Sequence, residues 1–187
     1  MEETPLVSGE IISDQTCISD KNMIHELELK GFGENEKGKL FLKSFETLYL
    51  LYTKRLILKK GKKQIDFDFF MSICQKIDPE ILTKFLIYRD LRNRGYVVKD
   101  GFGFGSDFRV YERGHYGEKG AKFLIFGFNE GQQEKMGNLQ KKIEEISQMG
   151  KEPIIAVIER RGEVIYYKIN QMNFYENKSR LEDFNSI

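Results

Sequence analysis

The stretch from Tyr111 to Phe126, YERGHYGEKGAKFLIF, contains the side chains of this chain that best suit proton transfer. Tyr111 ends an apolar segment, and His115 follows it in a charged loop that glycines interrupt. A phenol and an imidazole can act as base and acid at one centre, and a lysine such as Lys151 can stabilise negative charge. Taken singly, each has an ordinary role: a strand-end tyrosine mostly packs at a core or its rim, and Lys151 suits a helix C-terminus. The stretch is therefore either an acid–base site or the remainder of one.

No other motif offers a stronger site. Gly101, Gly103 and Gly105 suggest a phosphate-binding loop, but the segment FRVY after them is typical of a strand and not of the required helix. We interpret these glycines as a twisted turn between strands. The chain has no Walker-type loop, paired-carboxylate signature or serine elbow. Its two histidines, His25 and His115, are too far apart for a metal site, so we expect no metal and no cofactor.

Composition and charge restrict the partners. The 187 residues are 40% hydrophobic, enough for a substantial core, and carry 30 basic against 29 acidic side chains. This balance provides no overall field for nucleic acid, so any RNA contact must be a local patch. Cys17 and Cys74 form no C-x-x-C pair, and we expect buried free thiols in a reducing cytosol. No signal peptide or membrane-spanning run is present in the sequence, which predicts a cytoplasmic protein without membrane contact.

The pattern of apolar residues predicts an α+β fold with two parts. Residues 1–82 are expected to form a small mixed N-terminal domain, and residues 83–187 a C-terminal domain with a mixed sheet and one main flanking helix. The expected N-terminal strands are LVSGEIIS, MIHELELKGFG and GKLFL, followed by a helix over 44–56 with Ser44 as N-cap, a basic turn in LILKKGKKQID, and a helix over 69–76. A further helix is expected to begin at Asp78-Pro79, with Leu82 on its apolar face, and to end near Gly95.

The C-terminal part has a different pattern. We expect strands over 96–99, 108–112 and 122–128, a helix over 132–150, and a hairpin formed by PIIAVIE and VIYYKI across RRG. The apolar face of the helix comprises Met136, Leu139, Ile143 and Ile146. The polar tail from Asn173 is expected to be loosely held.

The segment YRDLRNRGYVVKDGFGFGSDFRVYERG (88–114) closely resembles a signature of the archaeal-type tRNA-splicing endonuclease (tRNA-intron endonuclease) family. In that family a helix ending Y-x-D-L-R-x-R-G-Y runs into V-K-x-G-x-x-x-G-x-D-F-x-V-Y. SFETLYLLYTKRL is similar to the family's N-terminal-domain helix, and KEPIIAVIERRGEVIYYKI to its closing hairpin. The resemblance covers most of the chain, is weakest over residues 1–40 and is absent for the tail.

The resemblance implies RNA cleavage without metal. In the family a tyrosine acts as general base on the 2′-OH, a histidine protonates the 5′-oxygen, and a lysine stabilises the phosphorane, which yields a 2′,3′-cyclic phosphate and a 5′-OH. Tyr111 matches the tyrosine because it ends the D-F-x-V-Y motif. Lys151, ahead of Ala156 in an apolar strand, matches the lysine.

The sequence departs from the family at two positions. The family histidine stands three residues before the aromatic that opens the next strand, as H-[SA]-x-Y; here that strand opens with Phe123, and the position is Gly120. His115 lies where the family has a variable loop. The arginine that grips the RNA bulge corresponds to Glu144, which would repel phosphate. We interpret the site as a decayed triad that keeps its tyrosine and its lysine.

Three functions follow from this interpretation. The family assembles as tetramers or pseudo-tetramers, some with separate catalytic and structural subunits, and our leading hypothesis is a non-catalytic structural subunit in a heterotetramer. Its partners would be pre-tRNA, cut at bulge-helix-bulge sites, and a catalytic paralogue. The second hypothesis is an active endonuclease in which His115 or another group is the acid. The third is an RNA-binding or assembly protein without a nuclease role.

Contacts between subunits are also implied by the resemblance. The family inserts an acidic hairpin loop of one protomer into a basic cleft of its neighbour, and the equivalent loop here is ERRGE (159–163). Arg160 and Arg161 interrupt its acidic run, so the loop departs from the family's pattern at these two positions. The strand VIYYKI (164–169) is apolar on both faces, so we expect it at a protomer interface.

Overall fold

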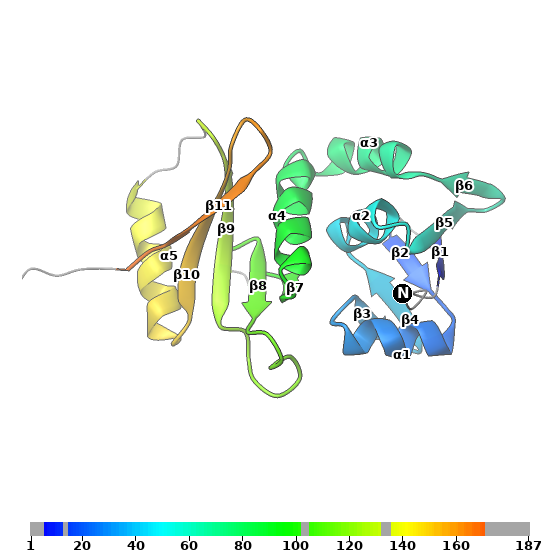
Figure 1. Ribbon diagram of the computed structural model, residues 1–187, viewed down its shortest axis with the longest axis horizontal. Helices are drawn as coiled ribbons and strands as arrows, with labels where there is room; N and C mark the ends of the chain where they lie inside the picture. The colour runs from blue at the N-terminus through cyan, green and yellow to red at the C-terminus, as the bar shows by residue number, and fades with distance from the viewer. Residues whose placement is uncertain (1–5, 13–14, 102–104, 132–135, 171–187) are drawn as a thin grey trace, which may run out of the picture.

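The computed structural model describes residues 6–12, 15–101, 105–131 and 136–170, and within these ranges the chain forms two β-sheets and five helices (Figure 1). The first sheet and its helices comprise β1 (Val7–Ile12), β2 (Gln15–Ile18), α1 (Lys21–Leu29), β3 (Glu34–Glu36), β4 (Lys39–Leu42), α2 (Ser44–Tyr52), β5 (Leu56–Lys60), β6 (Lys63–Ile65) and α3 (Phe67–Ile77). The second comprises α4 (Ile81–Asn93), β7 (Val97–Asp100), β8 (Phe108–Tyr111), β9 (Phe123–Asn129), α5 (Met136–Gln148), β10 (Glu152–Ile158) and β11 (Val164–Lys168).

Both sheets are mixed. The strand order of the first is β3-β4-β2-β1-β5-β6, in which β1 and β5 are parallel, and that of the second is β11-β10-β9-β8-β7, in which β9 and β10 are parallel. The parallel connection from β9 to β10 runs through α5, as such crossovers require. In Figure 1 α4 lies between the two sheets, and α5 covers the opposite face of the second. The α+β class predicted from the sequence is therefore confirmed.

One apolar core joins the two sheets across α4. Phe85, Tyr88 and Leu91 of α4 are buried. The ring of Phe45 on α2 lies 4.9 Å from that of Tyr88 and 5.0 Å from that of Phe108 on β8, measured between centroids. A smaller cluster under α5 contains Leu124, Phe126 and Ile146. Because both parts share the large core, α4 fixes β8 relative to the first sheet. The domain boundary at residue 82 stays a prediction.

The expected strand MIHELELKGFG is wrong, because its first part forms helix α1. The carboxylate of Asp20 accepts hydrogen bonds from the backbone N–H groups of Asn22, at 2.9 Å, and Met23, at 3.1 Å, which caps the helix. Ile24 and Leu27, spaced for one helical face, are buried, whereas Leu29 is 69% exposed. The alternation of Glu and Leu suggested a strand, and the cap at Asp20 was the signal that outweighed it.

Two expected helix starts are also corrected. Ser44 is the first residue of α2, and Lys43 holds the cap position. Asp78 ends α3 and accepts a hydrogen bond from Glu80 N–H, while Glu80 is the N-cap of α4. Leu82, expected on the apolar face of α4, is 44% exposed.

The other expected strands and helices agree with the structure to within a few residues. β2 and β3, strands of only 4 and 3 residues, were not expected from the sequence. The helix expected over 132–150 is α5, whose Ile143 and Ile146 are buried, whereas the side chains of Met136 and Leu139 lie outside the described residues. Gly103 lies outside the described residues, and so does the tail from Asn173. Both cysteines are free and buried. Within the described ranges, no helix has the length and apolar character needed to cross a membrane.

Candidate active site

Tyr111 is the last residue of β8 and pairs with Val97 of β7. Its ring meets that of Tyr116 edge to face, with centroids 4.9 Å apart and planes at 89°. Tyr116 belongs to the loop of residues 112–122 that joins β8 to β9. Burial and the neighbouring Tyr111 raise the pKa of Tyr116. Tyr111 therefore stands where the chain leaves the sheet, with its ring positioned by an aromatic of the following loop.

Lys151 and Gly120 lie next to each other before two parallel strands. Lys151 directly precedes β10, and Gly120 lies shortly before the first residue of β9. These first residues, Glu152 of β10 and Phe123 of β9, are in register with each other. A Cβ atom on Gly120 would lie 3.3 Å from Nζ of Lys151. The same ammonium donates a hydrogen bond to the carbonyl of Ala121. The position predicted for the missing acid thus directly adjoins the predicted lysine.

The strand directions place Tyr111, Gly120 and Lys151 at one edge of the second sheet. β8 is antiparallel to β9 and β9 is parallel to β10, so the end of β8 and the beginnings of β9 and β10 coincide. A backbone hydrogen bond of 2.9 Å from Lys122 N–H to the Val110 carbonyl links the first two of these ends. The sheet therefore gathers residues that are 40 positions apart in sequence, from Tyr111 to Lys151.

His115 is held within its own loop. Its backbone N–H donates to the Glu112 carbonyl, and its carbonyl accepts from the N–H groups of Glu118 and Lys119. Its Nδ1 lies 3.7 Å from Oε2 of Glu118 and makes no hydrogen bond among the described residues. In the part of the chain that the structure describes, His115 makes no hydrogen bond with either of the predicted catalytic side chains.

Glu144 lies on α5, where its Oε1 accepts a 3.0 Å hydrogen bond from Gln140. A cation on the same helix was missed by sequence reasoning: Nζ of Lys142 lies 5.6 Å from the centroid of Phe126. That ammonium would also lie 3.2 Å from a Cβ on Gly105, so it reaches toward the turn between β7 and β8. The same turn of α5 therefore places an ammonium, that of Lys142, against the sheet beside Glu144, and the sequence position alone did not reveal this.

The turn after α1 packs beneath the loop that carries these residues. Gly31 has a φ of +74°, and a Cβ on it would lie 2.3 Å from Cγ1 of Val97 and 3.3 Å from Cε1 of Tyr116. The carboxylate of Glu46, 1% exposed, accepts hydrogen bonds from Gly33 N–H at 3.0 Å and Lys43 N–H at 2.8 Å. The first sheet therefore contributes a support for Tyr116, and through it for Tyr111.

Two cations of the second part bind the same turn from the other side. Lys99 of β7 donates to the Gly33 carbonyl, and Nη1 of Arg92 donates to the Lys30 carbonyl at 2.9 Å. The guanidinium of Arg92 also lies 4.0 Å from the ring centroid of Phe32. Burial raises the pKa of Glu46 and lowers that of Lys99, while their mutual attraction opposes both shifts. No group of side chains suited to a metal ion occurs among the described residues.

Comparison with known proteins agrees with this arrangement. Residues 7–71 match the family model described as tRNA intron endonuclease, N-terminal domain, and residues 81–166 match that described as tRNA intron endonuclease, catalytic C-terminal domain. The chain belongs to the tRNA intron endonuclease family. The tRNA-splicing endonuclease of Methanococcus maripaludis is 32% identical over 167 residues, which cover 89% of this chain and 94% of the relative.

Other relatives in the tRNA intron endonuclease family match to a similar extent. The tRNA-splicing endonuclease of Thermococcus kodakarensis is 32% identical over 86% of this chain and 95% of its own length. That of Pyrococcus furiosus is 30% identical over 86% of this chain and 94% of its own length. The family membership expected from the signature of residues 88–114 is confirmed, whereas the roles of Tyr111, Lys151 and His115 remain predictions.

Proposed function

We propose that this chain is the structural, non-catalytic subunit of a heteromeric tRNA-splicing endonuclease, which removes introns from pre-tRNA together with a catalytic paralogue. The observation that carries the proposal is the position of Gly120. A side chain there would reach Nζ of Lys151, yet glycine offers no proton. The proposal is supported by the position of Tyr111 and Lys151, which the resemblance matches to the family's tyrosine and lysine, at the same sheet edge as Gly120.

The chemistry explains why this loss abolishes useful cleavage. A tyrosine can take the proton of the 2′-OH, and a lysine can stabilise the phosphorane, but the 5′-oxygen must also be protonated as it leaves. General-acid catalysis contributes roughly 10²–10⁴-fold to rate. Its loss raises the barrier by about 3–5 kcal/mol. A subunit freed from catalysis can tolerate that loss and still supply packing for the assembly.

The decisive experiment restores the acid. In Gly120→His the added Cβ meets only the flexible end of Lys151, and Gly120 has no left-handed backbone conformation that would strain a histidine. We expect the purified wild-type chain not to cut a bulge-helix-bulge pre-tRNA, and Gly120→His to gain at least about 10²-fold in single-turnover cleavage. Gly120→Gln is the matched control, because it fills the same space without a titratable proton.

Further variants separate this proposal from an active enzyme. Adding Tyr111→Phe to Gly120→His should remove the gain, and His115→Ala alone should change nothing. If the wild-type chain cuts RNA and His115→Ala abolishes cutting, His115 is the acid and the chain is an active endonuclease. If no RNA cleavage accompanies the chain even with its co-purified partners, the remaining reading is an RNA-binding or assembly protein.

The role within an assembly has its own test. We expect the chain to co-purify from its native cell with a family paralogue that retains the histidine, in a complex of four subunits. In that complex Lys151→Ala of this chain should leave the cleavage rate unchanged, because the chemistry belongs to the paralogue. A rate that falls by roughly 10²-fold or more would assign catalysis to this chain.

A further inference from the structure

The hairpin of β5 and β6 concentrates positive charge at the edge of the first sheet. Lys59, Lys60, Lys62 and Lys63 are all exposed, in the segment LILKKGKKQI. Gly61 has a φ of +60° and occupies the first central position of the two-residue turn, where a left-handed conformation is needed. We refer to Lys60, Lys62 and Lys63 as the hairpin tip.

The hairpin tip has no neutralising partner within the described part of the chain. Lys60 and Lys63 stand directly opposite each other in the antiparallel pair, and like charges in that position destabilise a hairpin. None of the three ammonium groups lies within 4.0 Å of a carboxylate in the described ranges. The fold therefore keeps a repulsive arrangement that an exchange to neutral side chains would relieve.

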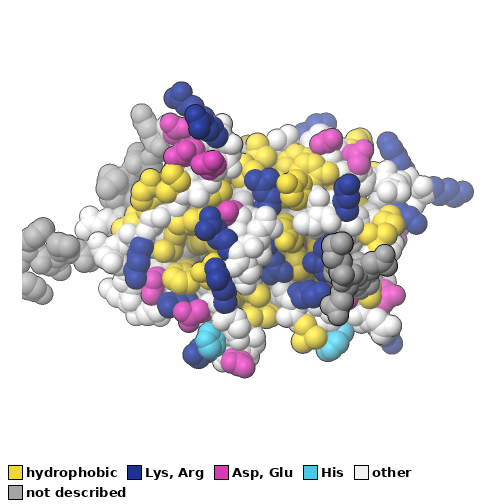
Figure 2. All heavy atoms as spheres, in the orientation of Figure 1, with side chains coloured by type: hydrophobic (Ala, Val, Ile, Leu, Met, Phe, Trp, Pro, Cys, Tyr) yellow, Lys and Arg dark blue, Asp and Glu magenta, His cyan; other side chains and the backbone are white. Residues whose placement is uncertain are grey.

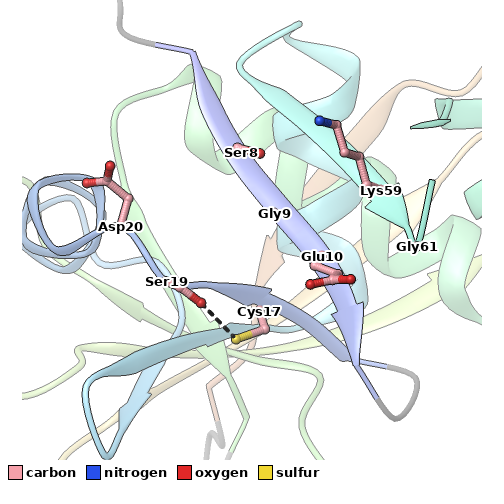
Figure 3. Close-up of a pocket in the computed structure, with 8 residues that line it drawn as sticks. All are labelled: Ser8, Gly9, Glu10, Cys17, Ser19, Asp20, Lys59 and Gly61. Atoms are coloured by element: carbon pink, nitrogen blue, oxygen red, sulfur yellow. Dashed lines mark hydrogen bonds between the residues drawn. The ribbon is translucent and has the colours of Figure 1, made fainter. Parts of the chain in front are cut away.

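Lys59 differs from the tip because carboxylates lie near it. It is in register with Glu10 of β1. Both line a hollow that runs along the hairpin as far as Gly61 and also includes Asp20 and Cys17 (Figure 3). The side chains of Lys59 and Glu10 point in different directions in Figure 3, and no ion pair joins them. The hollow thus carries mixed charge, and the unbalanced positive charge begins only at the tip.

An exposed aromatic ring adjoins the tip. Phe69, in the first turn of α3, is 44% exposed, and Nζ of Lys63 lies 4.7 Å from its ring centroid. Aromatic rings beside cations are the surfaces on which unpaired bases and riboses stack. Phosphate contact and base stacking are therefore available side by side.

The hairpin is remote from the sheet edge that carries Tyr111 and Lys151. In Figure 1 β5 and β6 extend from one end of the long axis, whereas α5 lies at the other, and Figure 2 shows Lys and Arg side chains at the hairpin end. An elongated substrate would meet the two regions at separate points along its length.

We propose that the hairpin tip and Phe69 bind the phosphate backbone of pre-tRNA outside the splice site. The proposal rests on the function proposed above, since it takes pre-tRNA as the substrate. Phosphate is favoured over an acidic protein because three unpaired ammonium groups and an adjoining ring match a strand of phosphates and bases. The competing explanation is that lysines on an edge strand only prevent pairing with other sheets.

The experiment compares two doubly substituted hairpins. Lys62→Glu/Lys63→Glu changes the tip, and Lys37→Glu/Lys39→Glu makes the same change of charge in the exposed β3–β4 hairpin at the opposite edge of the sheet. Glutamate keeps each edge charged, so protection against aggregation is retained. Binding of a full-length pre-tRNA transcript to the complete chain is titrated between about 50 and 200 mM salt.

We expect the tip variant to bind pre-tRNA about 10- to 100-fold more weakly than the wild type at the lowest salt. The slope of the logarithm of its binding constant against the logarithm of the salt concentration should be smaller in magnitude by about two. The control should lose less than about threefold, because it alters net charge without removing phosphate contacts. Equal losses of affinity in the tip variant and the control would overturn the proposal. An unchanged salt dependence of binding in both variants would overturn it as well. If the tip variant misfolds, Lys62→Gln/Lys63→Gln with an unchanged thermal midpoint replaces it.

Two further arms locate the contact and identify a protein partner. A short RNA that contains only the bulge-helix-bulge should bind both variants equally; a selective loss with the tip variant would place the hairpin at the splice site and overturn the proposed location. If the tip variant binds pre-tRNA normally but no longer assembles with the paralogue, the hairpin is a protein interface. Pre-tRNA binding is measured with the purified chain alone. Its outcome therefore does not depend on whether Gly120→His restores cleavage.

Discussion

At Glu46 one buried carboxylate holds a turn of the first sheet in the position that the second sheet requires. It accepts from two backbone N–H groups, at Gly33 and Lys43, and lies near the cations of Arg92 and Lys99. Burial disfavours its charged form, whereas the hydrogen bonds and the cations favour it. Burial dominates, so the pKa of Glu46 is raised above its ordinary value of 4.5.

This direction predicts how stability depends on pH. A folded-state pKa above the unfolded one means that the folded chain holds the proton more tightly, so the stability that Glu46 contributes is fully present below about pH 4.5 and is lost as pH rises through the raised value. The free energy of unfolding of the wild type minus that of Glu46→Gln should therefore fall as the pH rises above about 4.5. Urea denaturation at several pH values measures it.

The control for this prediction is Glu36→Gln, since Glu36 is exposed on β3. The free energy of unfolding of Glu36→Gln should stay within about 0.5 kcal/mol of the wild-type value at every pH. A wild-type advantage over Glu46→Gln that grows with pH would show that Lys99 and Arg92 outweigh burial. Glu46→Ala should cost about 3 kcal/mol at neutral pH, because it leaves two backbone N–H groups without their acceptor and the buried ammonium of Lys99 without a nearby carboxylate.

At the scale of elements, the site depends on how the turn after α1 fits beneath β7 and the β8–β9 loop. Gly31→Ala combines a left-handed backbone with a Cβ that would stand 2.3 Å from Val97. We expect a loss of about 2–4 kcal/mol in unfolding free energy, from conformational strain and overpacking together. Gly38→Ala has a similar φ of +81° with no atom within 4 Å, so it should cost only about 1 kcal/mol.

The same pair of variants reports on the position of the loop. In the Gly120→His background Gly31→Ala should also slow cleavage, since Tyr116 rests on the turn and Tyr111 on Tyr116, whereas Gly38→Ala should not. Equal losses of stability in the two glycine variants would mean that backbone strain alone accounts for them and that the turn does not support the loop.

At the scale of the whole molecule, the expected interface strand is β11, an edge strand of the second sheet. Tyr167 is 52% exposed, and the unpaired edge offers hydrogen bonds to another strand. The neighbouring loop ERRGE turns back on its own chain: Arg160 N–H donates to Glu130 at 3.1 Å, and its guanidinium lies 3.6 Å from that carboxylate. Glu130 thus compensates the charge of Arg160, one of the two arginines that interrupt the acidic run.

We expect the chain to form an oligomer through β11, alone or with its paralogue. Tyr167→Asp should place an unpaired charge in that contact and reduce the mass seen by light scattering toward the 22.0 kDa of one chain at micromolar concentration. Leu82→Asp is the control, since Leu82 is 44% exposed in the first turn of α4, where an acid is tolerated. A wild-type chain that is monomeric with and without its partner would contradict the prediction.

The sequence by itself determined the family, the α+β class and most elements of the second sheet. The signature ending at Tyr111 is long and specific. The apolar runs predict the strands of the second sheet, and Gly95 predicts the end of the helix that precedes them. The sequence also predicted that Gly120 takes the position at which the family has its histidine. Local patterns failed where two periodicities competed, as at α1, because alternation of Glu and Leu also fits a helix that Asp20 caps.

Only the tertiary structure decided which residues meet. Strand direction brings Tyr111, Gly120 and Lys151 to one sheet edge, and no local pattern encodes the pairing of β9 with β10. The support of Tyr116 by Gly31 likewise depends on packing between segments that the sequence does not align. The physical reason is that composition and periodicity act within a segment, whereas a site forms from contacts that become favourable only once the whole core is assembled.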